Sequence, residues 1–167
     1  GGGDRLWGKG DGRKYVGEKG WTANKRAKAA GDAGLAAIIC VGENLAAREQ
    51  GITMDWIRLQ TKIALPGFSE ADMKKVIIAY EPVWAIGTGK TATPEQAGEV
   101  CGALRAVLRK LYGARSARGC TIPYGGSMDP NNAPGLLAQP GVDVGLIGSA
   151  SQDPAKFLQI LHTANQE

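Results

Sequence analysis

Short apolar runs alternate along the chain with longer segments in which apolar residues recur every three or four positions. Compact apolar runs predict buried strands, and the longer spacing predicts helices. The predicted strands cover 35–41, 76–80, 121–124 and 142–147. The predicted helices cover 23–33, 44–49, 53–64, 94–111, 130–138 and 154–164. Alternating helices and buried strands favour parallel βα units, and leave open whether the sheet is doubly wound or closed into a barrel.

Helix boundaries carry their own signals. Thr93 precedes a proline and stands three residues before Gln96, which is the pattern of a capping box. Asn44 and Asp153 are further candidate N-caps. The helix over 53–64 rests on apolar residues at spacings of three and four, and the one over 94–111 has a longer apolar side. These positions are Ile52, Trp56, Leu59 and Ile63, followed by Val100, Leu104, Val107, Leu108 and Leu111.

Composition narrows the class of protein. The 167 residues suit one domain, and a hydrophobic share of 43% suffices for a core. The net charge of +4 comes from scattered basic residues, which does not favour nucleic-acid binding. No apolar run approaches the roughly 18 residues of a membrane span, and the N-terminus lacks the apolar core of a signal peptide. Three cysteines without metal-ligand spacing predict neither a disulfide scaffold nor a zinc site, and a reducing cytosol is the simplest setting.

The run from Ala79 to Lys90 holds the strongest candidate for chemistry. A buried strand ends in the carboxylate of Glu81, a proline follows at once, and Gly87-Thr88-Gly89 forms the tip of a loop with stiff ends. A base beside a pliable loop is one way to build a covered reacting centre. The alternatives are a strand-end glutamate in a salt bridge and an ordinary turn.

Four segments together resemble the triosephosphate isomerase family. They are Cys40-Val41-Gly42-Glu43 with Arg48-Glu49-Gln50-Gly51, the stretch from Ala79 to Thr93, Tyr124-Gly125-Gly126-Ser127, and the stretch from Gly145 to Ser151. The order matches that of strands five to eight of the family's eight-stranded barrel. The resemblance therefore implies an α/β fold of the (β/α)8 barrel type, here as a partial barrel in a single domain over 1–167. Residues 23–167 are family-like, and residues 1–22 match poorly.

The resemblance also implies an activity. The family interconverts dihydroxyacetone phosphate and glyceraldehyde 3-phosphate in the cytoplasm, as a homodimer, without metal or organic cofactor. Glu81 would be the catalytic base. The phosphate of the substrate would be bound by Gly87, Ser127, Gly148 and Ser149.

Several positions depart from the family. Gly2 stands where the family has its histidine, the family's first-loop lysine has no counterpart, and Ser149 replaces a glycine. Asp4 and Arg5 match either a family pair near the active site or a plain surface loop. We therefore expect this chain alone to be weakly active or inactive. Two alternatives stay open: a non-catalytic phosphate-binding remnant, and a half-barrel that assembles with a partner.

Three further polar residues are expected to have no catalytic role. His162 is the only histidine and lies beside apolar residues of the last predicted helix, which favours a packed or solvated side chain. Glu43 and Arg48 are expected to tie the loops at the strand ends together.

Overall fold

The core of the fold is a four-stranded parallel sheet. A computed structural model describes residues 20–86, 88 and 90–165 of the chain. The strands are β1 (Ala37–Val41), β2 (Val76–Tyr80), β3 (Pro123–Tyr124) and β4 (Val144–Gly145), and they lie side by side in chain order. β1 and β2 pair along their whole length, from Ala37 opposite Val76 to Val41 opposite Tyr80. Within the described residues the sheet does not close into a barrel.

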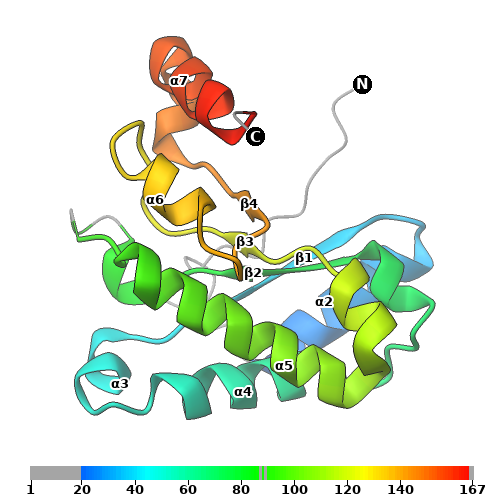
Figure 1. Ribbon diagram of the computed structural model, residues 1–167. Coiled ribbons are helices and arrows are strands. Elements are labelled where there is room, and N and C mark those ends of the chain that lie inside the picture. Colours follow the sequence, from blue (N-terminus) through cyan, green and yellow to red (C-terminus); the bar gives the residue numbers. More distant parts are fainter. Residues whose placement is uncertain (1–19, 87, 89, 166–167) are drawn as a thin grey trace.

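Helices connect the strands, as the alternating pattern predicts. They are α2 (Gly20–Asp32), α3 (Leu45–Glu49), α4 (Thr53–Ala64), α5 (Pro94–Gly119), α6 (Ala133–Leu137) and α7 (Pro154–Ala164), with short 3-10 helices η1 (Asp72–Lys75), η2 (Val83–Ala85) and η3 (Ser149–Gln152). Figure 1 shows α4 and α5 side by side beneath the sheet. The predicted strands 121–124 and 142–147 are shorter than expected, because only two residues of each pair in the ladder.

The two faces of the sheet differ in their covering. Side chains alternate between faces along a strand. The face that includes Ile39, Val41, Ile78 and Tyr80 belongs to the buried core, together with apolar residues of α4 and α5. On the other face the paired residues Ile38 and Ile77 are only half-buried. In a closed barrel this second face would line the interior.

The buried side of α4 is not the side that the apolar spacing indicates. Thr53, Ile57, Thr61 and Ala64 are the buried residues of the helix. Thr61 can be buried because its hydroxyl donates to the Ile57 carbonyl at 2.8 Å. The residues whose spacing predicts the helix are exposed by 38–53%. They are Ile52, Trp56, Leu59 and Ile63. The helix is therefore confirmed, but its apolar spacing does not mark the core.

Helix α5 consists of two helical segments joined at a kink. Gly113 has φ 81° and ψ 171°, and a positive φ is accessible to glycine at little cost. The predicted helix 94–111 is the first part, and a short second part follows the kink to Gly119. The capping box is confirmed: the Thr93 hydroxyl accepts from the Gln96 N–H at 3.2 Å, and the Gln96 side chain accepts from the Thr93 N–H at 3.0 Å.

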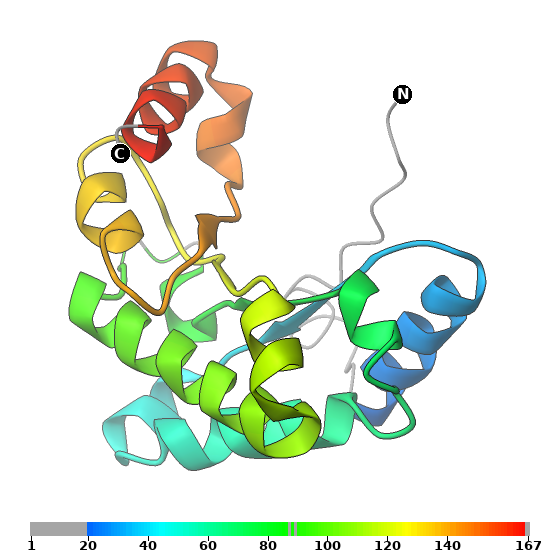
Figure 2. The same cartoon turned by 45° about the vertical axis from the view of Figure 1, so that its right-hand side comes forward.

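The C-terminal helix stands apart from the long helices. Figures 1 and 2 show α6 between α5 and α7. Ile160 is the only buried residue of α7, while Leu158 and Leu161 are exposed. The predicted cap is confirmed, since the Asp153 carboxylate accepts from the Ala155 and Lys156 N–H groups. In the part of the chain that the structure describes, no helix combines the length and apolarity needed to cross a membrane.

Candidate active site

Glu81 follows directly after β2, at the edge where the parallel strands end. Its N–H donates to the Val41 carbonyl at 2.8 Å, which continues the pairing with β1 by one residue. Tyr80 belongs to the helix-covered core, so alternation directs the Glu81 side chain to the other face, the interior side of a barrel. The residue is 8% exposed. A carboxylate thus lies nearly buried at the mouth of the partial barrel.

Two glycines make room for this glutamate. A Cβ built on Gly125 would lie 2.7 Å from the Glu81 Cγ and 3.3 Å from its Oε1. A Cβ built on Gly42 would lie 1.6 Å from the Glu81 carbonyl oxygen. Glycine at the end of β1 lets the two backbones approach, and glycine after β3 lets the Glu81 side chain lie against the neighbouring strand. The turn Tyr124-Gly125-Gly126-Ser127, which follows β3, therefore also helps to position Glu81.

A second buried carboxylate anchors the first half of the loop after Glu81. Glu43 is fully buried, and its Oε1 accepts from Tyr80 Oη at 3.1 Å, from Trp84 Nε1 at 2.9 Å and from Arg48 at 3.4 Å. The Val83 N–H also donates to the Glu43 carbonyl at 3.0 Å. The expected role of Glu43 and Arg48 in tying the strand-end loops together is confirmed. Glu43 Oε2 has no hydrogen-bond partner among the described residues.

The second half of the loop is held by β3 and its following turn. The Ala92 N–H donates to Tyr124 Oη at 3.3 Å, and the Thr91 hydroxyl donates to the Ser127 carbonyl at 3.2 Å. Asn132 donates to the same carbonyl at 3.1 Å. Both ends of the loop are thus fixed to neighbouring strand ends.

Burial governs the ionisation of the two tyrosines beneath the loop. Burial, then the nearby Glu43 carboxylate, raise the pKa of Tyr80 well above its usual range. Burial also raises the pKa of Tyr124, against its hydrogen bonds with Thr91 and Ala92, which lower it. Both phenols therefore stay protonated at neutral pH and act as hydrogen-bonding groups rather than bases.

The remaining predicted site residues follow the next two strands. Ser127 is exposed in the turn after β3, and its hydroxyl makes no hydrogen bond within the described part of the chain. Gly148 and Ser149 are exposed after β4, where Ser149 opens the 3-10 helix η3. The segment after β4 therefore holds only one short turn of 3-10 helix, and α7 begins at Pro154. Gly87 lies outside the described residues.

Several other positions complete the comparison with the sequence. Gly2, Asp4 and Arg5 lie outside the described residues. His162 lies near the end of α7, and no ion pair or hydrogen bond of its side chain occurs within the described part. Across residues 20–86, 88 and 90–165, no group of three or more His, Cys, Asp or Glu residues could hold a metal ion.

Sequence reasoning missed the tyrosine and threonine contacts around this site. The signal that could have found Tyr80 and Tyr124 is their shared position, each being the last residue of its strand. They are paired across the sheet, and their ring centroids lie 6.0 Å apart. Thr91 carries no such signal, because it meets Tyr124 only through the tertiary structure.

A nearly buried carboxylate after one strand of a parallel βα sheet, bordered by the ends of neighbouring strands, is the arrangement of a βα-barrel enzyme. The described residues form one part of such a barrel. The sequence model of triosephosphate isomerase matches residues 7–164. The chain belongs to the triosephosphate isomerase family.

Curated relatives agree with this assignment. Triosephosphate isomerase of Acetivibrio thermocellus is 53% identical over 139 residues, covering 83% of this chain and 55% of the relative. That of Lacticaseibacillus casei is 48% identical over 148 residues, covering 89% of this chain and 59% of the relative. That of Chlorobium chlorochromatii is 49% identical over 152 residues, covering 91% and 60%. The chain thus spans rather more than half the length of these relatives.

Proposed function

We propose that this chain contributes the proton-transferring part of a triosephosphate isomerase. The relatives' name describes the interconversion of a phosphorylated ketose and aldose, dihydroxyacetone phosphate and glyceraldehyde 3-phosphate. Such a reaction needs a base that removes a proton beside a carbonyl and returns it to the neighbouring carbon. The observation that carries the proposal is Glu81, which is nearly buried at the end of β2 on the interior side of the partial barrel.

The surroundings of Glu81 suit this role. Low exposure restricts competing water, which favours shuttling of one proton between two carbons. Gly125 allows the Glu81 side chain to lie against the end of β3. The hydrogen bond from the Glu81 N–H to the Val41 carbonyl fixes the backbone of Glu81. A base held from two sides keeps its geometry without reorganisation during the reaction.

The substrate phosphate is proposed to bind at the ends of β3 and β4. Ser127 offers an exposed hydroxyl. Its backbone carbonyl is already held by hydrogen bonds from Thr91 and Asn132. Gly148 and Ser149 offer backbone N–H groups at the start of η3, and Gly87 would add another from the loop. Barrels commonly hold phosphate after their seventh and eighth strands.

The full activity is proposed to need the rest of a barrel. The chain alone is expected to turn over substrate slowly, because a family histidine and lysine that would stabilise the developing oxyanion have no match in it. Loss of one preorganised donor typically costs about 10²–10³ in turnover. We further propose a homodimer in the cytoplasm for the complete enzyme, as the resemblance to the family implies.

A completed barrel tests the role of Glu81. The N-terminal part of the Acetivibrio thermocellus relative, joined ahead of this chain, supplies the missing strands. In that protein Glu81→Asp should lower kcat by about 10²-fold or more with little change in KM, because retraction by one methylene misplaces the base. The assay couples product formation to NADH oxidation. Glu95→Asp, at the start of α5, is the matched control and should leave kcat unchanged. Near-normal turnover by Glu81→Asp would remove Glu81 from the mechanism.

The same completed protein tests the phosphate site. Ser149→Gly should tighten the binding of a phosphate-bearing inhibitor, by about 1 kcal/mol if the serine Cβ crowds the anion. Calorimetric titration with phosphoglycolate measures the change. Equal or weaker affinity would show that Ser149 does not hinder the anion.

A second candidate function is a half-barrel that assembles with a partner or with a second copy. The observation that favours it is the exposure of Val144 on β4 and of Leu158 and Leu161 on α7. An unpaired strand edge beside apolar residues invites pairing with another chain. Light scattering separates the possibilities. A monomer with slow turnover supports the first candidate, and a stable dimer that loses its assembly in Val144→Lys supports the second.

A further inference from the structure

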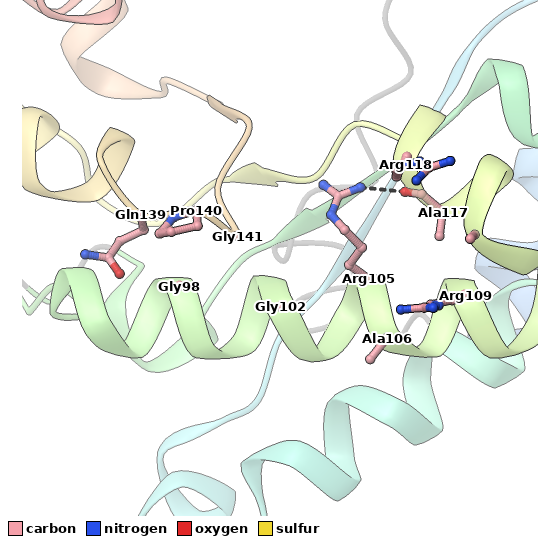
Figure 3. A pocket seen from close by; sticks show the side chains of 11 residues that line it. Gly98, Gly102, Arg105, Ala106, Arg109, Ala117, Arg118, Gln139, Pro140 and Gly141 are labelled. Atoms are coloured by element: carbon pink, nitrogen blue, oxygen red, sulfur yellow. Dashed lines mark hydrogen bonds between the residues drawn. The ribbon is translucent and has the colours of Figure 1, made fainter.

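A groove of about 630 Å³ lies along α5, away from Glu81. Its walls are the outer side of α5, the short helical segment after the kink at Gly113, and the turn that leads to β4. Figure 3 shows three arginines at one end of the groove, and Gln139, Pro140 and Gly141 at the other. The arginines are Arg105, Arg109 and Arg118.

The closed end of the groove is a direct contact between backbones. A Cβ on Gly141 would lie 2.6 Å from the Gly98 carbonyl oxygen, and one on Gly98 would lie 2.6 Å from Gln139 Oε1. The turn therefore packs on the helix with no space between them. Gly102 differs, because a Cβ there would meet no atom within 4 Å. The floor of the groove is open above Gly102.

One of the arginines is already engaged in the fold. Arg105 donates to the Ala117 and Cys120 carbonyls and forms an ion pair with Asp143 at 2.6 Å. Asp143 in turn accepts from the Ile122 N–H at 2.7 Å. This network joins the end of α5 to the segments before β3 and β4. It fixes one wall of the groove and uses most of the hydrogen-bonding capacity of Arg105.

The other two arginines make no such contacts within the described part of the chain. Arg109 and Arg118 are exposed, and neither has an ion pair or a hydrogen bond with any residue that the structure describes. No aspartate or glutamate is among the described residues that line the groove. Two guanidinium groups without counter-charges therefore border a cavity in the size range of small-molecule sites.

We propose that this groove binds an organic phosphate of about nucleotide size. Arg109 and Arg118 bind the phosphate groups, because the planar guanidinium fork matches phosphate oxygens with paired hydrogen bonds. The planar ring of the ligand lies on the open backbone floor at Gly102. A glycine floor accepts a flat ring at close range, which a floor of branched side chains would prevent.

The position of the groove separates this inference from the proposed isomerase activity. Its Arg105 wall contacts Cys120 and Asp143, which precede β3 and β4. Glu81 follows β2, so it lies at the opposite, carboxyl ends of the parallel strands. Binding in the groove therefore requires no part of the proposed catalytic site, and it can be tested on the chain of 167 residues.

Calorimetric titration of this chain with magnesium-free ATP, pyrophosphate and adenosine, at about 0.1 M salt, tests the ligand class. We expect saturable binding of ATP, weaker binding of pyrophosphate and no measurable binding of adenosine. Equal affinity for pyrophosphate and ATP would overturn the role of the ring. Absence of ATP binding at millimolar concentration would overturn the site.

Paired variants test the location. Arg109→Ala/Arg118→Ala should weaken ATP binding at least about tenfold, because it removes the charge-assisted hydrogen bonds. Lys110→Ala/Arg115→Ala removes the same charge from the same stretch of α5, at exposed residues that do not line the groove, and should change the affinity less than about twofold. Equal losses in the two double variants would show attraction to general positive charge and would overturn the proposal.

A third variant blocks the floor without removing charge. Gly102→Leu places a side chain in the open part of the groove, and leucine is the better helix former. We expect loss of ATP binding with an unchanged or raised melting temperature. Retained affinity in a folded Gly102→Leu chain would overturn the placement of the ring.

Discussion

The two ends of the sheet, with β1 and β2 at the first and β3 and β4 at the second, are built differently. At the first end, β1 and β2 pair over five residues, α4 packs against β1 with four buried residues, and α5 packs against β2. At the second end, β3 and β4 pair over two residues, and α7 contributes one buried residue. An apolar-lined space of about 630 Å³ remains between β4, α6 and α7. β1 and β2 thus form a long, buried pair, whereas β3, although buried itself, pairs over only two residues with the less buried β4.

This difference bears on the candidate site. Glu81 and the Glu43 cluster belong to the well-packed end, so their geometry is supported by the core. The proposed phosphate-binding residues after β4 belong to the loosely packed end. In a closed barrel the eighth strand is paired on both sides. We therefore expect completion of the barrel to order the phosphate site more than the base.

The largest expected effect compares the two ends by truncating one side chain in each. Ile57→Ala removes a fully buried side chain of α4, and should lower the free energy of unfolding by about 3 kcal/mol through lost burial and the cavity left behind. Leu158→Ala, at a residue of α7 that is 55% exposed, should cost less than about 1 kcal/mol. Urea denaturation followed by circular dichroism measures both. Similar losses at the two positions would contradict the difference in packing.

A smaller effect is expected from the helix caps. Thr93→Ala removes the hydroxyl that caps α5 and should lower the free energy of unfolding by about 1 kcal/mol. Asp153→Ala removes the corresponding cap of α7. Because α7 is weakly attached, this second change should appear as faster amide exchange within α7 rather than as a global loss. Native-state hydrogen exchange distinguishes the two. A global loss of about 1 kcal/mol from Asp153→Ala would mean that α7 unfolds together with the core.

The smallest effect concerns acid stability near η1, at the packed end. Asp72 Oδ2 accepts from Ser69 N at 2.7 Å and from Ser69 Oγ at 2.8 Å. These hydrogen bonds hold the pKa of Asp72 below its usual value of 3.8. Since the folded pKa is depressed, the stabilisation is present above the unfolded pKa and is lost as the pH falls through the folded pKa.

The test uses unfolding measurements at neutral pH and at pH values below about 4. Asp72→Asn should reduce the loss of stability on acidification slightly, because one such carboxylate no longer titrates. Asp55→Asn, on the exposed side of α4, is the matched control for removing a surface charge. If Asp72→Asn and the unaltered chain lose the same free energy of unfolding on acidification, these hydrogen bonds do not contribute to stability.

Much of the fold could be predicted from local signals. Capping by Thr93, Asn44 and Asp153 was predicted correctly, because a cap depends on residues within three positions of one another. The order of strands and helices was likewise predicted from compact apolar runs. The lengths of β3 and β4 were not, since a ladder needs a partner strand at every position, and that partner is remote in sequence.

The candidate site divides in the same way. Glu81 was predicted because it follows an apolar run and precedes a recognisable loop. The contacts of that loop with Tyr124, Ser127 and Glu43 join residues that lie more than thirty positions apart in the chain. No local pattern specifies such contacts. They arise because parallel strands end at one edge of the sheet.

The sequence by itself determined the alternation of elements, the family, the candidate base and the caps, because each depends on local order or on a continuous motif. The tertiary structure decided which side of α4 is buried, where α5 bends back, and how Arg105 and Asp143 join two strand beginnings. It also left Arg109 and Arg118, beside a groove, without partners among the residues that the structure describes. The physical reason is that burial and pairing of charges depend on distances between residues that only packing brings together.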